Sequence, residues 1–150
     1  MTPFTRRTVL LLALATAACG RRPARDDTPA PAGSAEVNRL IRHYAQVYDV
    51  PEPLIHRVVR RESNYNVSAK NGPYLGLMQI LPQTARTMGH RGDAAELLTA
   101  DTNLRYAVKY LRGAYLVARG NQDRAVMWYS KGYYYEAKRM GLLKETGLRA

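Results

Sequence analysis

Apolar residues recur at helical spacing along the chain from residue 37 onward. The first stripe consists of Val37, Leu40, Ile41, Tyr44 and Val47. A repeat with this period places the apolar side chains on one face of an amphipathic helix. Pro51 and Pro53 interrupt the pattern, and Pro53 suits the first turn of a new helix, where its missing N–H costs nothing. The second stripe, which comprises Leu54, Ile55, Val58 and Val59, therefore predicts a second helix.

Further helices are predicted in the second half of the chain. Residues 82–89 form one, and a clear stripe of Leu104, Ala107, Val108, Leu111 and Tyr115 forms another. Gly120 and Asn121 break that stripe, and helices at 123–130 and 134–143 follow. An alternating pattern appears only as a short irregular ribbon near residues 65–76. We therefore expect an all-α fold class, mostly helical with one small β-ribbon, over residues 37–150.

Residues 1–19 have the pattern of a signal peptide. Arg6 and Arg7 precede an apolar stretch of about a dozen residues, too short to cross a bilayer permanently. The arginine pair resembles a twin-arginine export signal. Residues 17–20, Ala-Ala-Cys-Gly, resemble a lipoprotein processing site at which Cys19 is acylated. Ordinary cleavage after Ala17, or a Cys19 that is simply buried in the core, are the alternatives.

Residues 20–36 are rich in Pro, Ala, Gly, Asp and Arg, which predicts a disordered linker. We therefore expect an exported, periplasmic protein that is tethered to a membrane through a lipid on Cys19. The resemblance to lipoproteins implies attachment to the outer membrane, since Gly20 rather than Asp follows the cysteine. If Cys19 is not acylated, simple secretion remains the alternative.

The net charge of the chain favours anionic partners but does not identify which kind. The formal net charge is +11, and a surface this basic attracts nucleic acid, anionic lipid or an acidic polymer. The Lys and Arg residues are scattered over several predicted helices rather than grouped on one, and together with the export signal this argues against nucleic acid. The three histidines, His43, His56 and His90, have no ligand spacing, so we expect no metal site and no cofactor.

Glu62 is the most informative single residue. It follows Val59, Val58 and Ile55 by three, four and seven positions, which places it on the apolar face of its own helix. A charged carboxylate on such a face is unfavourable unless it is paired or its pKa rises. A carboxyl group that stays partly neutral near pH 7 suits a general acid in glycoside cleavage. A frayed helix end or an ion pair with a nearby Arg are the alternatives.

Four segments then resemble, in order, the motifs of the lytic transglycosylase SLT domain. They are residues 61–66 (Arg-Glu-Ser-Asn-Tyr-Asn), 76–85 (Gly-Leu-Met-Gln-Ile-Leu-Pro-Gln-Thr-Ala), 103–111 and 128–132 (Trp-Tyr-Ser-Lys-Gly). The resemblance implies a compact, goose-lysozyme-like helical fold with a long substrate cleft. The sequence departs from the family pattern at Ala107, Trp128, Ser130 and Lys131, so the far wall of the cleft is not specified by the resemblance.

The resemblance also implies the roles of individual residues. Glu62 corresponds to the single catalytic carboxyl group, and Tyr129 to a tyrosine that hydrogen-bonds and orients it. Gln79 corresponds to a cleft residue near the scissile sugar. The other substrate-binding candidates are Ser63, Asn71, Met78 and Ser130. Asn103 is expected to contact the following helix or the substrate, or to cap a helix.

One carboxylate suffices in the chemistry that this family implies. Ordinary glycosidases use two, and Asp93, Glu96, Asp101 and Asp123 lie in polar segments typical of caps or surface charges. Glu62 would protonate the oxygen between N-acetylmuramic acid and N-acetylglucosamine, and then deprotonate the muramic acid 6-hydroxyl to give a 1,6-anhydro product. A goose-type lysozyme hydrolase and a non-catalytic peptidoglycan-binding module are the alternatives. We expect a monomer acting on peptidoglycan glycan strands.

Overall fold

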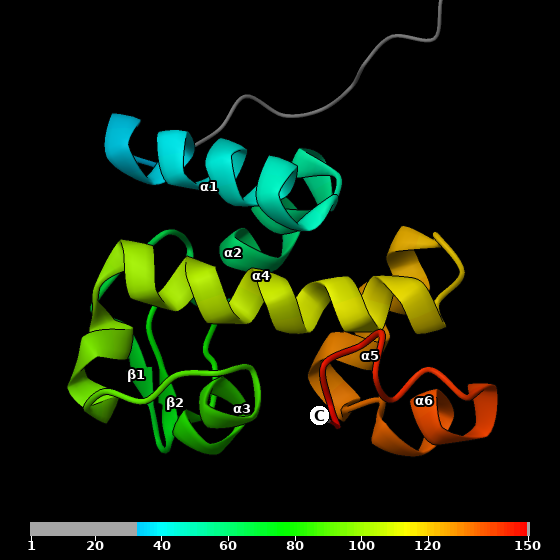
Figure 1. The fold of residues 1–150 in the computed structure, drawn as a ribbon. Helices are drawn as coiled ribbons and strands as arrows, with labels where there is room; N and C mark the ends of the chain where they lie inside the picture. The colour runs from blue at the N-terminus through cyan, green and yellow to red at the C-terminus, as the bar shows by residue number, and fades with distance from the viewer. Residues whose placement is uncertain (1–32, 150) are drawn as a thin grey trace, which may run out of the picture.

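The computed structural model describes residues 33–149, which form a mostly helical domain with one small hairpin (Figure 1). In order, its elements are α1 (Ala35–Tyr48), α2 (Glu52–Ser63), β1 (Lys70–Asn71), β2 (Tyr74–Leu75), α3 (Pro82–Thr87), the 3-10 helix η1 (Ala94–Leu98), α4 (Ala100–Val117), α5 (Gln122–Lys131) and α6 (Tyr134–Met140). The two strands are antiparallel, and Lys70 faces Leu75. The predicted fold class, mostly helical with a single β-ribbon, is confirmed.

The long helix α4 is the centre of the domain. It contacts α1, α3, α5, α6 and η1. In Figure 1, α1 runs along one side of α4, the hairpin and α3 lie beside its N-terminal half, and α5 and α6 lie beside its C-terminal half. The predicted apolar stripe explains this position, because four of its five side chains, Leu104, Ala107, Val108 and Leu111, are fully buried. Ala114 and Val117 of α4 are fully buried as well, whereas Tyr115 is only partly buried.

The first helix begins two residues earlier than the sequence pattern suggested. The Ser34 side chain accepts a hydrogen bond from the backbone N–H of Val37 at 3.2 Å, so it caps the helix and α1 starts at Ala35. Residues 1–32, which include the proposed signal peptide, Cys19 and most of the proposed linker, lie outside the described residues. None of the described helices is long and apolar enough to cross a membrane.

A glycine in α4 makes room for a buried tyrosine. Tyr133 is 1% exposed, and its hydroxyl donates a hydrogen bond to the Tyr110 carbonyl oxygen at 2.8 Å. A methyl group on Gly113 would overlap this phenol, since it would lie 2.7 Å from Cζ of Tyr133. The neighbouring Tyr134 and Tyr135 are 47% and 83% exposed. The Tyr-Tyr-Tyr run therefore supplies one core residue and two surface residues.

We predict that Gly113→Ala destabilises the domain, although alanine normally stabilises a helix interior by about 1 kcal/mol relative to glycine. The overlap with Tyr133 should outweigh this gain and lower the free energy of unfolding by about 1–3 kcal/mol. Urea denaturation measures the change. In the Tyr133→Ala background the same substitution should become neutral or stabilising. A Gly113→Ala variant as stable as the unsubstituted protein would refute this packing account.

Candidate active site

Helix α2 holds Glu62 at the edge of its buried face. Ile55, Val58 and Val59 are fully buried, whereas the Glu62 side chain is 23% exposed. The helix continues to Ser63 and ends at Asn64, which has a left-handed conformation with φ of 48° and an N–H bonded to the Arg60 carbonyl. Glu62 therefore belongs to a formed helical turn, and the alternative of a frayed end is wrong.

Two opposing effects act on the Glu62 carboxyl group. Burial disfavours its charged form and raises its pKa above the ordinary value, and the nearby Arg61 guanidinium lowers it by a smaller amount. Nε of Arg61 lies 3.7 Å from Oε1 of Glu62, and the Arg61 side chain is 52% exposed. Such a long and hydrated ion pair compensates burial only in part. The net result is a carboxyl group that keeps its proton to a higher pH than a free glutamate.

A tight turn over residues 75–80 forms the wall opposite Glu62. The backbone N–H and carbonyl groups of Leu75 and Ile80 bond reciprocally at 3.1 Å in each direction. Gly76 and Gln79 both adopt left-handed conformations, with φ of 73° and 49°. A side chain on Gly76 would also overlap the amide of Asn103 and the backbone of Leu97. Only glycine satisfies both requirements at position 76.

Asn103 anchors this turn from α4. Its side chain is fully buried, and Oδ1 accepts a hydrogen bond from the Met78 N–H at 2.9 Å. Its Nδ2 donates to the carbonyl oxygens of Leu75 and Leu97, each at 2.8 Å. The N-cap of α4 is Thr99, so the expected role of Asn103 as a helix cap is wrong. Asn103 is fully buried and does not line either hollow of the cleft described below. A buried amide with three backbone partners is a structural anchor.

Gln79 is held at the cleft by its own backbone neighbours. Its Nε2 donates to the carbonyl oxygens of Gly76 and Ala69 at 2.8 and 3.2 Å. Both amide protons are thereby used, which leaves the side-chain carbonyl oxygen as the group able to accept a hydrogen bond from a ligand. The strained backbone of Gln79 is consistent with a residue that the turn holds in one orientation.

Tyr129 is close to Glu62 but bonds to a different partner. Its hydroxyl donates to the Met78 carbonyl oxygen at 2.8 Å, and no hydrogen bond to Glu62 is made among residues 33–149. The expectation of that bond is corrected. The turn directs the Met78 carbonyl towards α5, so this oxygen, and not the Glu62 carboxylate, accepts the hydrogen bond from the Tyr129 hydroxyl. Burial, and to a smaller extent the nearby Glu62 carboxylate, raise the pKa of Tyr129 well above its ordinary value. The Tyr129 hydroxyl therefore keeps its proton near neutral pH and acts as a hydrogen-bond donor.

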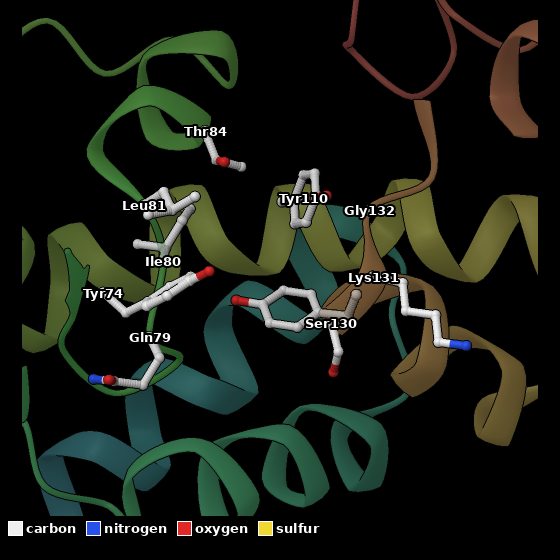
Figure 2. Close-up of a pocket in the computed structure, with 10 residues that line it drawn as sticks. Tyr74, Gln79, Ile80, Leu81, Thr84, Tyr110, Ser130, Lys131 and Gly132 are labelled. Atoms are coloured by element: carbon white, nitrogen blue, oxygen red, sulfur yellow. The ribbon is translucent and has the colours of Figure 1, made fainter. Parts of the chain in front are cut away.

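The cleft consists of two adjoining hollows of about 220 Å³ each. Both are lined by Tyr74, Gln79, Tyr129 and Ser130. The first also contains Arg61, Glu62 and Asn71. The second continues past α3 and the end of α5, where its lining includes Leu81, Thr84, Tyr110, Lys131 and Gly132 (Figure 2). The structure thus brings five predicted site residues together around one cleft: Glu62, Asn71, Gln79, Tyr129 and Ser130.

Two predicted substrate contacts lie behind the cleft wall instead. The Met78 side chain is fully buried in the core, so only its backbone contributes to the site. The Ser63 hydroxyl donates to the Leu77 carbonyl oxygen at 2.7 Å, which ties the end of α2 to the turn. The assignment of both as substrate-binding residues is corrected, because their polar groups are already used to position Glu62 and Gln79.

Sequence reasoning did not assign Tyr74 or Tyr110 to the cleft, and it noted Lys131 only as a departure from the family pattern. Tyr74 is 43% exposed at the hairpin, and Figure 2 shows its ring pointing into the middle of the hollow. Tyr110 and Lys131 line the second hollow. A tyrosine directly after Gly72-Pro73 was a usable signal for Tyr74, since a turn exposes the residue that follows it. Tyr110 carried no such signal, because it lies inside a predicted helix, next to its apolar stripe.

The family model of the transglycosylase SLT domain matches residues 39–144. The matched range includes all elements of the cleft from α2 to α5. This chain belongs to the transglycosylase SLT domain family. No solved structure matches it. Membership of the SLT family supports a lytic transglycosylase type of function, with peptidoglycan as the class of substrate.

We predict that Asn103→Ala destabilises this SLT domain by roughly 2–4 kcal/mol, because it leaves the Met78 N–H and the Leu97 carbonyl without partners in a buried place and removes one of the two hydrogen bonds to the Leu75 carbonyl. Asn103→Asp should also destabilise, since a carboxylate cannot donate to the Leu75 and Leu97 carbonyl oxygens. Denaturant unfolding measures both changes. Asn121→Ala is the matched control and should cost only about 1 kcal/mol, because it removes one exposed helix cap. Equal losses for Asn103→Ala and Asn121→Ala would contradict the anchoring role.

Proposed function

We propose that this SLT domain is a peptidoglycan lytic transglycosylase that cleaves the bond between N-acetylmuramic acid and N-acetylglucosamine without water. The observation that carries the proposal is the half-buried Glu62 carboxyl group, which faces the cleft and has a raised pKa. Among the residues described, no second Asp or Glu lines either hollow. A single carboxyl group whose raised pKa lets it keep its proton to a higher pH than a free glutamate fits this reaction.

In the proposed reaction, Glu62 acts first as an acid and then as a base. The protonated carboxyl group gives its proton to the glycosidic oxygen, and the bond from that oxygen to the anomeric carbon of the muramic acid breaks. The Glu62 carboxylate then takes the proton of the 6-hydroxyl of the same sugar, and the 6-oxygen bonds to the anomeric carbon. The product is a 1,6-anhydro sugar, and Glu62 regains its proton. The proposed steps use no cofactor and no metal.

The cleft residues supply binding and positioning for this reaction. The Gln79 carbonyl oxygen can accept a hydrogen bond from a sugar hydroxyl or amide. The exposed ring of Tyr74 offers an apolar face for a sugar ring. Asn71 and Ser130 add polar groups at the edge of the first hollow. Tyr129 acts through Met78 and so keeps the turn and Gln79 in place opposite Glu62.

A goose-type lysozyme would use the same acid with a water molecule as nucleophile. Inverting hydrolysis normally requires a second carboxylate that activates this water. The lining of the cleft supplies none among the residues described. A hydrolase and a binding module without activity are therefore treated as outcomes of the product analysis below.

The proposal also places the domain outside the cytoplasm. It rests on the pattern of residues 1–19, with export through the paired Arg6 and Arg7, acylation of Cys19 and attachment to the outer membrane from the periplasmic side. A tether at Cys19 would hold the cleft near the wall polymer on which it acts.

We predict that the full chain releases 1,6-anhydromuramyl products from purified peptidoglycan and that Glu62→Gln releases none. The amide keeps the shape of the side chain but cannot give or take the proton. Mass spectrometry of the released fragments distinguishes the outcomes. Glu145→Gln makes the same chemical change at an exposed position outside the cleft and should keep full activity.

Reducing-end products that are lost in Glu62→Gln would identify a hydrolase. Retained binding with no product from either chain would identify a binding module, and both results would overturn the proposed reaction.

We predict that Glu62→Gln is at least as stable as the unsubstituted domain, and that its advantage grows as the pH rises. Below the ordinary glutamate pKa of 4.5, Glu62 is protonated in both folded and unfolded chains and costs nothing. As the pH rises through the raised pKa of the folded state, the unfolded chain ionises more readily and the folded state loses stability. Thermal unfolding from acidic to neutral pH measures the difference. An advantage that shrinks with pH would show that Glu62 is stabilised as a carboxylate.

A further inference from the structure

Lys131 occupies a fixed place on the wall of the cleft. Two residues before it, the Tyr129 hydroxyl bonds to the Met78 carbonyl oxygen, and two residues after it, the Tyr133 hydroxyl bonds to the Tyr110 carbonyl oxygen, each at 2.8 Å. These two buried tyrosines hold the backbone of Lys131 from both sides. Helix α5 ends immediately after it at Gly132, whose φ is 81°. The position of the backbone is therefore determined, although the side chain is exposed.

The Lys131 ammonium group has no ion pair or hydrogen bond with any other residue in the range 33–149. Figure 2 shows its side chain extending from the end of α5 away from Tyr74 and Gln79, and it lines the second hollow. A cation in the last turn also interacts favourably with the helix dipole. The interaction with the dipole gives a small gain in stability. It would be the same on any side of the helix, so it does not explain why Lys131 lines the cleft.

The charges around the cleft are unbalanced. Its charged lining residues are Arg61, Glu62 and Lys131. Arg61 lies beside Glu62 and is partly compensated by it. Lys131 has no anion near it in the second hollow, whose other lining residues are uncharged. An uncompensated cation at the edge of a cleft favours ligands that bring a negative group to that place.

We propose that Lys131 is a specificity-determining residue that binds a free carboxylate on the peptide side chain of a glycan strand. The proposal rests on the proposed function, because it assigns a preference to the same cleft. Lys131 is exposed at the rim, so it meets a group that projects from the strand rather than a sugar ring on the floor. A flexible side chain with a point charge suits a carboxylate whose position varies with the peptide. The domain should therefore prefer strands with free peptide carboxylates to strands in which these are amidated.

The test compares the full chain with Lys131→Met on two preparations of one peptidoglycan, one with free carboxylates and one with its carboxylates converted to amides. We expect Lys131→Met to raise the half-saturating concentration of the free-carboxylate preparation about two- to five-fold, the effect of one exposed ion pair. The maximal rate and the values on the amidated preparation should not change. Added salt should weaken the difference, and Lys131→Arg should restore it.

Lys138→Met is the matched control. Lys138 is also an exposed lysine in the last turn of a helix, but it lies on α6 away from the cleft. Its substitution removes the same charge and a similar dipole interaction, so it should change the melting temperature as Lys131→Met does, whereas the half-saturating concentration of each preparation should stay that of the unsubstituted chain. Equal effects of the two substitutions on the free-carboxylate preparation would overturn the proposal, since net charge alone would explain them.

Cosedimentation with the two preparations separates this proposal from the proposed reaction. If the full chain releases no product, the reaction fails, and weaker binding of Lys131→Met to the free-carboxylate preparation alone still supports the role of Lys131. If the full chain cleaves and binds both preparations equally, the reaction stands and the role of Lys131 is overturned.

Discussion

The hydrogen bonds of the Asn103 side chain are the constraint on which the cleft depends. The turn at residues 75–80 has backbone groups that neither helix nor sheet can pair, and burial makes each unpaired group cost about 1–3 kcal/mol. One amide on α4 pairs with the Met78 N–H and the Leu75 carbonyl oxygen of this turn, and also with the Leu97 carbonyl oxygen of η1. The central helix thus determines the shape of a loop that carries Gln79, which lines the cleft.

Hydrogen bonds join the turn to the two helices on either side of the cleft. Ser63 bonds to the Leu77 carbonyl oxygen and so fixes the turn against the end of α2, next to Glu62. Tyr129 bonds to the Met78 carbonyl oxygen and fixes it against α5. Consecutive peptide groups of one short segment are therefore held by α2, α4 and α5. The polar bonds behind the cleft position Glu62 and Gln79 relative to each other, which is what preorganisation of an acid and its substrate requires.

The electrostatics of the cleft follow from the same packing. Helix α2 places Glu62 at the border of the core, where partial loss of water raises its pKa, and leaves Arg61 on the hydrated side. The cleft then holds one carboxyl group with a raised pKa and two cations, of which Lys131 has no counter-charge among the residues described. A cationic rim of this kind favours ligands that bring a negative group to it.

Hydrophobic periodicity in the sequence determined the helices and the place of Glu62, because the faces of a helix follow from residue spacing alone. The motifs likewise indicated Gln79, Tyr129 and the family. Only the tertiary structure decided that Met78 and Ser63 support the wall, that Asn103 anchors the turn, and that Tyr129 bonds to Met78 rather than to Glu62. Asn103 and Tyr129 reach Met78 across 25 and 51 residues of sequence. These hydrogen-bond partners depend on which backbone groups remain unpaired after the helices have packed. A local sequence pattern contains no information about that packing.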